Sequence, residues 1–249
     1  MNTIYTCGIK INPITTAQVL EYIEDCFAKN KKGVQITGVN IEQFALLKKD
    51  KSFKKYVNSS DIVNIDGIIV YLYLKFKFYK VKQRTLCAEI MEAMLQTANQ
   101  KCRSIYLLGA EEETIKKLVE VISNKYPSIK IVGQHNGFFK DEKAIVKDIE
   151  SKSPDYLFIG MPSPFKERFI ATYKQELNTG VCFGVGGMFD ILAGVVKRAP
   201  EKYQKAGLEW IYRITQNPKE HSKRVFRALI PSLYIFIKHL FERKSQVNN

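Results

Sequence analysis

The chain of 249 residues is long enough for one large domain or two small ones with a proper core. Its formal net charge of +14 predicts an anionic partner, such as nucleic acid, a phosphorylated small molecule or an acidic membrane surface. Five scattered cysteines without a CxxC pair argue against a disulfide framework or a zinc site, and three histidines offer little to a metal centre or a Ser-His triad.

The first elements place polar residues at the end of a strand. Residues 3–11 are expected to form a strand, followed by a helix that one of two adjacent threonines caps. Residues 33–40 should form the next strand and residues 41–49 a helix. Because open α/β sheets bind ligands at the carboxyl ends of their strands, Thr37 and Asn40 are candidate ligand contacts. Alternatively, Thr37 is an ordinary strand residue and Asn40 a helix cap.

Asp66 is an acidic residue inside the otherwise apolar end of segment 61–70, and Gly67 follows it. A carboxylate in such a setting loses hydration, which makes it a plausible proton acceptor. It also precedes the apolar run 68–78, so it could instead cap a helix. The residues alone favour neither the proton acceptor nor the helix cap.

Residues 75–84 alternate basic and aromatic side chains. This pattern suits a nucleic-acid patch, a membrane-facing edge or a solvated surface, and the last is the commonest. Thr85 is expected to cap the helix that runs to Gln100.

From Cys102 onward the pattern becomes regular. The alternation predicts a parallel sheet with right-handed crossovers, so the fold class is α/β, Rossmann-like and flanked by helices, with a C-terminal amphipathic helical appendage. The strand ends carrying Gly109, Gly137, Gly160 and Gly186 should line one edge and form a single pocket. The strands are expected at 104–108, 129–132, 156–159 and 181–185, and the helices between them at 111–125, 141–151 and 164–177.

A glycine turn follows the last of these strands. Gly186 and Gly187 come directly before a helix that is expected to begin at Met188. Such a turn exposes backbone N–H groups and the positive end of a helix dipole to an anion, most often a phosphate. Phe189 stands where the dinucleotide fingerprint requires a third glycine, so a plain steric turn remains an alternative and nicotinamide chemistry is disfavoured.

The tail, residues 213–249, combines cationic and apolar positions. Segment 225–241 is mostly apolar, but it is shorter than the roughly 20 residues of a spanning helix and contains Arg227 and Pro231. We therefore predict an interfacial anchor whose basic residues, Arg224 among them, meet anionic lipid. The alternative is a helix pair packed on the protein's own core or on another subunit.

Two segments, GVGGMFDILAGVVKRAP from Gly184 and GLEWIYRITQNP from Gly207, resemble the signature of the WecG/TagA/CpsF glycosyltransferases, family 26. Enzymes of that family move a sugar from a UDP-sugar to a polyprenyl-pyrophosphate-linked acceptor during assembly of bacterial surface polymers. The resemblance implies that Asp66, in an Asp-Gly pair after a strand, is catalytic and that Arg84 handles pyrophosphate charge. The family's Gly-x-Pro-Lys-Gln-Glu turn retains Glu167 here, but Phe165-Lys166 replaces Lys-Gln, which leaves the donor sugar open.

We accordingly expect an inverting glycosyltransferase that moves a hexose or N-acetylhexosamine, of N-acetylmannosamine type, from a UDP-sugar in surface polysaccharide or teichoic acid synthesis. No Asp-x-Asp manganese motif occurs, so neither an essential metal nor another cofactor is expected. Residues 1–212 should form the catalytic domain, with a subdivision near residue 101 left open, and residues 213–249 the membrane-association segment. The N-terminus lacks a signal-peptide pattern, which predicts a cytoplasmic protein peripheral on the inner face of the bacterial membrane.

The expected site has three parts. Asp66 would be the base that activates the acceptor hydroxyl, with Thr37 and Arg84 completing the catalytic set. The expected partners are the UDP-sugar, the lipid-linked acceptor and an anionic membrane, without nucleic acid and with homo-oligomerisation left open; a basic nucleic-acid-binding α/β protein is the alternative. Donor contacts are expected from Asn40, Gly109, Gly137, Gly160, Lys166, Glu167, Gly186, Gly187 and Asp190, and acceptor or membrane contacts from Lys197, Arg198, Arg213, Arg224 and Arg227.

Overall fold

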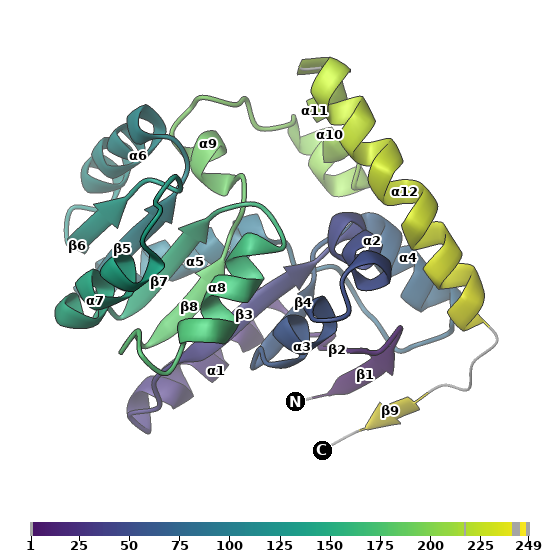
Figure 1. Cartoon of the computed structure of the whole chain (residues 1–249), viewed down its shortest axis with the longest axis horizontal. Helices are drawn as coiled ribbons and strands as arrows, with labels where there is room; N and C mark the ends of the chain where they lie inside the picture. Colours follow the sequence, from purple (N-terminus) through teal and green to yellow (C-terminus); the bar gives the residue numbers. More distant parts are fainter. Residues whose placement is uncertain (1, 217, 241–244, 248–249) are drawn as a thin grey trace.

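A parallel sheet forms the centre of the molecule, which confirms the predicted α/β class. The computed structural model describes residues 2–216, 218–240 and 245–247. Its six-stranded sheet has the order β4-β3-β8-β7-β5-β6, and all neighbouring strands run parallel (Figure 1). The strands are β3 (Val34–Val39), β4 (Ile62–Ile65), β5 (Ser104–Gly109), β6 (Lys130–His135), β7 (Tyr156–Gly160) and β8 (Val181–Gly184).

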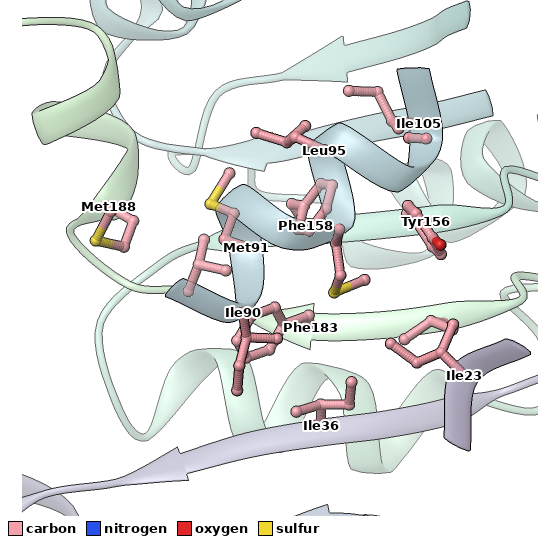
Figure 2. Packing of buried hydrophobic residues seen from close by; sticks show 14 of the residues in the cluster. Ile23, Ile36, Ile90, Met91, Leu95, Ile105, Tyr156, Phe158, Phe183 and Met188 are labelled. Carbon is pink, nitrogen blue, oxygen red and sulfur yellow. The ribbon is translucent and has the colours of Figure 1, made fainter. Parts of the chain in front are cut away.

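Helices cover both faces of this sheet because successive strand side chains point to opposite faces. On one face, α5 packs over alternate strand residues, and Figure 2 shows Ile90, Met91 and Leu95 in one cluster with Phe158 and Phe183. The helices of this face are α1 (Thr16–Ala28), α5 (Cys87–Gln100) and α6 (Glu112–Lys125). The other face is covered by α2 (Ile41–Lys49), α3 (Phe53–Asn58), α4 (Ile68–Phe76), α7 (Glu142–Lys152) and α8 (Phe165–Tyr173).

The N-terminal segment differs from the single strand that its sequence predicts. It forms a hairpin of β1 (Thr3–Thr6) and β2 (Ile9–Ile11), and β9 (Ser245–Val247) pairs with the outer side of β1. The chain turns at Cys7 and Gly8, whose φ angles of 54° and 78° lie in the left-handed region that glycine favours. The prediction of one strand was wrong because this turn is only two residues long.

Two predicted helix starts have opposite outcomes. Thr15 caps α1 in a capping box with Gln18, as predicted. Thr85 does not cap α5, because its hydroxyl donates to the carbonyl of Ile14 and Leu86 holds the cap position without a side-chain hydrogen bond. The helix expected over residues 164–177 also ends earlier, at Tyr173.

The last helices lie beyond the carboxyl ends of the strands. After β8 come α9 (Met188–Leu192), α10 (Glu201–Ala206) and α11 (Glu209–Gln216), and a long loop joins α9 to α10 in Figure 1. The expected domain boundary at residue 212 falls inside α11. α12 (Pro218–Leu240) then runs back along α2 and α4 (Figure 1).

α12 is anchored to the protein's own core by one of its faces. Phe236 is 7% exposed; its ring stacks on Tyr73 at a centroid distance of 4.2 Å and lies 5.0 Å from the ring of Phe44. The buried Ser232 hydroxyl donates to the carbonyl of Ile41 at 2.7 Å. The alternative of packing on the core therefore holds for this face. Among the described residues, no helix is both long and apolar enough to cross a bilayer.

Candidate active site

The order of the strands brings the predicted catalytic and phosphate-binding segments to one edge of the sheet. β4, β3 and β8 are neighbours, and Thr37 of β3 lies opposite Gly184 while Gly38 lies opposite Asn64. Asp66 and the turn at Gly186 and Gly187 thus leave the sheet two strand spacings apart, about 10 Å. We call this region, formed by Asp66, Arg84, Gly186, Gly187, Asp190, Glu209 and Arg213, the edge site.

Asp66 is half-buried directly after β4. Its backbone N–H donates to the carbonyl of Val39 at 3.1 Å, and its Oδ1 accepts the backbone N–H of Cys87 at 2.8 Å. Cys87 is the first residue of α5, so Asp66 stabilises the start of that helix, whereas Gly67 holds the cap position of α4. Asp66 thus stabilises the start of α5 and does not cap α4, the helix for which the sequence suggested it. The role of Asp66 as a base remains a prediction.

Arg84 connects the Asp66 turn to the C-terminal helices. Its guanidinium donates to the carbonyl of Asp66 at 3.3 Å and to the carbonyl of Gln204 in α10 at 3.0 Å. Both acceptors are backbone oxygens, so this arginine fastens α10 beside Asp66 and keeps a positive charge at the edge site.

Thr37 and Asn40 are both engaged within the protein. Thr37 is 2% exposed, and its hydroxyl lies 2.7 Å from that of Ser60. Asn40 is the N-cap of α2, with its Oδ1 accepting the backbone N–H of Glu42 at 2.8 Å. The cap interpretation of Asn40 is confirmed. Asn40 also lies directly against Gly67, since a Cβ added to Gly67 would come within 2.7 Å of the Asn40 Cβ.

The glycine turn begins where β8 ends. Gly186 has a φ of +56°, a left-handed conformation that suits glycine, and Gly187 precedes α9. α9 is only five residues long, so its dipole is weaker than that of a full helix. Beside the turn, Phe189 packs so tightly on Gly160 that a Cβ there would come within 2.4 Å of its ring.

The remaining predicted glycines lie together at the ends of β5 and β7. A Cβ on Gly109 would come within 2.6 Å of the Gly160 carbonyl, and one on Gly137 within 3.3 Å of the Gly109 Cα. Gly109 is therefore required by close backbone packing, Gly160 makes room for the Phe189 ring, and the contact at Gly137 is tight. Their contact with a donor remains a prediction.

Lys166 and Glu167 form a buried ion pair below this edge. Their charged atoms are 2.7 Å apart, and their side chains are 7% and 1% exposed. The Ser163 hydroxyl donates to the same Glu167 oxygen at 2.7 Å, accepts from Lys166, and accepts from the amide of Gln43 at 2.9 Å. The pair thus ties the β7–α8 turn to the start of α2, and the Lys166 stem fills the space over Gly184.

Arg213 of α11 reaches the glycine turn. Its Nη1 lies 3.8 Å from the point where a Cβ on Gly187 would stand, and the Asp190 Oδ2 lies 3.7 Å from the same point. Burial raises the pKa of Asp190 above its ordinary value, Arg213 acts in the opposite direction, and Glu111 raises it again. Within the described part of the chain, Arg213 forms no ion pair shorter than 4.0 Å, so its charge is available to an anionic ligand.

Glu209 was missed by the sequence interpretation. Burial raises the pKa of its carboxyl, and the negative charge of Asp66 raises it further, whereas Arg213, Arg84 and Arg198 lower it. This carboxylate therefore lies among the charged groups of the edge site. Its position four residues before Arg213 was the available signal, since such residues share one helix face.

The other predicted cations lie in the loop before α10, on α12, or among residues whose side chains the structure does not describe. Lys197 is exposed, and its backbone N–H and carbonyl pair with the side chain of Gln216. Arg198 lies 3.8 Å from Glu92, and Arg227 is exposed on α12. Arg224 lies outside the residues whose side chains the structure describes. In the described residues no group of three or more His, Cys, Asp or Glu side chains is arranged to hold a metal ion.

Comparisons with known proteins identify the family of the chain. The model of the glycosyl transferase WecG/TagA/CpsF family matches residues 4–246. The chain is 34% identical to an N-acetylglucosaminyldiphosphoundecaprenol N-acetyl-beta-D-mannosaminyltransferase of Bacillus subtilis (strain 168) over 199 residues, which cover 80% of this chain and 78% of the relative. A Staphylococcus aureus (strain MW2) protein of the same name is 27% identical over 241 residues, covering 96% and 92%. The chain belongs to the WecG/TagA/CpsF family of glycosyltransferases.

Proposed function

We propose that this protein transfers N-acetylmannosamine from its UDP derivative to N-acetylglucosamine on a polyprenyl-diphosphate lipid, with inversion at the anomeric carbon, in teichoic acid or related polymer synthesis. The relatives from Bacillus subtilis and Staphylococcus aureus are named for transfer of this sugar to this kind of acceptor. The observation that supports the proposal best is the placement of Asp66, the glycine turn and Arg213 at one edge of the sheet.

Asp66 is proposed to be the general base. An acceptor hydroxyl is a weak nucleophile near neutral pH, so a carboxylate aligned with it should take its proton as its oxygen bonds to the anomeric carbon. One carboxylate oxygen of Asp66 is held by the backbone of Cys87, which fixes the orientation of the group. The bond from the anomeric carbon to the UDP oxygen breaks in the same step, and UDP leaves with that electron pair.

The departing diphosphate gains negative charge, which fixed positive groups can stabilise. Arg213 stands over Gly187, and Arg84 stands beside Asp66, so cations are present at both ends of the edge site. We propose that these arginines and the backbone of the glycine turn bind the diphosphate, without an essential metal ion. EDTA should then leave turnover intact, and a loss of turnover that manganese restores would contradict this part.

The outer face of α12 is proposed to rest on the membrane. Large apolar side chains recur along it at helical spacing and are exposed: Phe226 63%, Ile230 70%, Leu233 54%, Tyr234 53% and Ile237 55%. Phe76 and Phe78, at the end of the adjoining α4, are 66% and 82% exposed. The exposed cations Lys223, Arg227 and Lys238 flank this apolar face. An apolar face flanked by cations binds an anionic membrane surface, which is where a lipid-linked acceptor lies.

The test is a transfer assay with a panel of UDP-sugars and a prenyl-diphosphate-linked N-acetylglucosamine acceptor, read by mass spectrometry. We expect transfer from UDP-N-acetylmannosamine and thermal stabilisation by UDP. A single-stranded oligonucleotide serves as the control ligand. Stabilisation by the oligonucleotide without stabilisation by UDP would overturn the proposal in favour of a nucleic-acid-binding protein.

A further inference from the structure

The start of α11 is held directly against the Asp66 turn. Gly207, at the corner between α10 and α11, has a φ of +73°, and a Cβ there would come within 2.7 Å of the Ile68 Cβ. Ile68 begins α4 just after Asp66 and Gly67. Arg84 adds a second fastening, because it donates to the carbonyls of both Asp66 and Gln204. Glu209, the first residue of α11, therefore lies near the Asp66 turn, which is consistent with the effect of the Asp66 charge on its pKa.

α11 extends from this corner to the glycine turn. Arg213 follows Glu209 by one helical turn on the same face of α11, and its guanidinium lies at Gly187. The helix thus presents a carboxylate at the Asp66 end of the edge site and a cation at the Gly187 end.

Among the residues that the structure describes, Glu209 has no hydrogen-bond or ion-pair partner for its carboxylate. In the part of the chain that the structure describes, its half-buried carboxylate accepts no side-chain or backbone hydrogen bond and forms no ion pair within 4.0 Å. Leaving a partly desolvated carboxylate unpaired is costly, since burial and the charge of Asp66 both act against its ionised form. A ligand that donates hydrogen bonds would relieve this cost.

The charges at the two ends of the edge site indicate which substrate binds at Glu209. A diphosphate is attracted to Arg213 and repelled by Glu209, so it belongs at the Gly187 end. An ionised carboxylate only accepts hydrogen bonds, and sugar hydroxyls donate them. The attacking hydroxyl must lie at Asp66, which places the rest of the acceptor sugar beside Glu209.

We propose that Glu209 binds the acceptor sugar by accepting a hydrogen bond from a hydroxyl other than the attacking one, an inference that rests on the function proposed above. The contact fixes the rotation of the sugar ring, so that the attacking hydroxyl faces both Asp66 and the anomeric carbon. Glu209 is in this sense a residue that selects acceptors by the position of their hydroxyl groups.

The experiment compares the wild type with Glu209→Gln, using an N-acetylglucosaminyl diphosphate on a short prenyl chain and the monodeoxy analogues of that acceptor. We expect kcat/KM for the parent acceptor to fall at least tenfold in Glu209→Gln, chiefly through KM, while the Kd of UDP changes less than twofold. Glu150→Gln removes an exposed carboxylate from α7 and is the matched control. With the wild type, one deoxy analogue should lose the same factor in kcat/KM. With Glu209→Gln this analogue should lose little more, because the charge-assisted hydrogen bond that it cannot make is already lost in the variant.

Each other outcome overturns the inference. Unchanged acceptor kinetics, or losses that multiply for every deoxy analogue, would mean that Glu209 does not touch the sugar. A loss of kcat as complete as that of Asp66→Asn would make Glu209 the base, and weaker UDP binding would make it a support for Arg213. If the wild type transfers no sugar, the proposed function itself fails, and this result is distinct from an unaffected variant of an active enzyme.

Discussion

Arg213→Ala should remove the positive charge that α11 holds over the glycine turn. The guanidinium lies 3.8 Å from the position of a Cβ on Gly187 and has no ion-pair partner within 4.0 Å among the described residues. Two unit charges about 4 Å apart at an effective dielectric constant of about 20 interact by about 4 kcal/mol. Loss of one oriented donor at a developing charge typically costs about 2.7–4 kcal/mol, so kcat should fall on the order of 100-fold to 1000-fold.

The assay is release of UDP under saturating donor and acceptor, together with calorimetric titration of UDP. We expect UDP to bind more weakly as well, because Arg213 attracts the diphosphate before the reaction and in the transition state. Arg213→Lys should recover part of the rate, since it restores the charge without the fork geometry. Lys143→Ala removes an exposed cation from α7 and controls for net charge. A fall in kcat below threefold with an unchanged UDP affinity would refute the placement of the diphosphate at Arg213.

Three further perturbations address the base, the membrane face and the half-buried carboxylate of Glu209. Asp66→Asn should abolish transfer while UDP affinity stays within a few-fold, and retained turnover in the same assay would exclude Asp66 as the base. Phe226→Glu with Ile230→Glu should release the protein from anionic vesicles in a sedimentation assay without changing its melting temperature, because both side chains are exposed; unchanged sedimentation would argue against the α12 face. Glu209→Gln should raise the melting temperature at pH 7.5 but not near pH 4. The folded pKa of Glu209 is raised above the unfolded value of about 4.3, so its ionisation destabilises the fold as pH rises through the folded pKa; a variant less stable at pH 7.5 would contradict this reasoning.

The strand ends of the edge site could be predicted from the sequence because parallel strands share one direction. Once residues 104–185 alternate between strand and helix, the glycines after each strand must lie at the same edge. The position of Asp66 next to that edge follows from the same rule, and the structure confirms it through the pairing of β4 with β3 and of β3 with β8. The family signature added Arg84, whose position no periodicity reveals.

Glu209 and the placement of the tail could not be predicted in the same way. In the sequence, Glu209 is an ordinary acidic residue in the first turn of a helix, and its approach to Asp66 depends on the contact between Gly207 and Ile68. α12 carries apolar residues on two faces. Only the tertiary structure shows that Phe236 packs on Tyr73 while Phe226 and Ile230 stay exposed.

The central claim is that Asp66 and the glycine turn bind the same donor substrate. A crystal structure of the protein with UDP-N-acetylmannosamine tests it most directly. We predict that the diphosphate lies against Gly186 and Gly187, within hydrogen-bond distance of Arg213, and that the sugar points toward Asp66. A nucleotide bound on another face of the molecule, or a sugar directed away from Asp66, would contradict this arrangement.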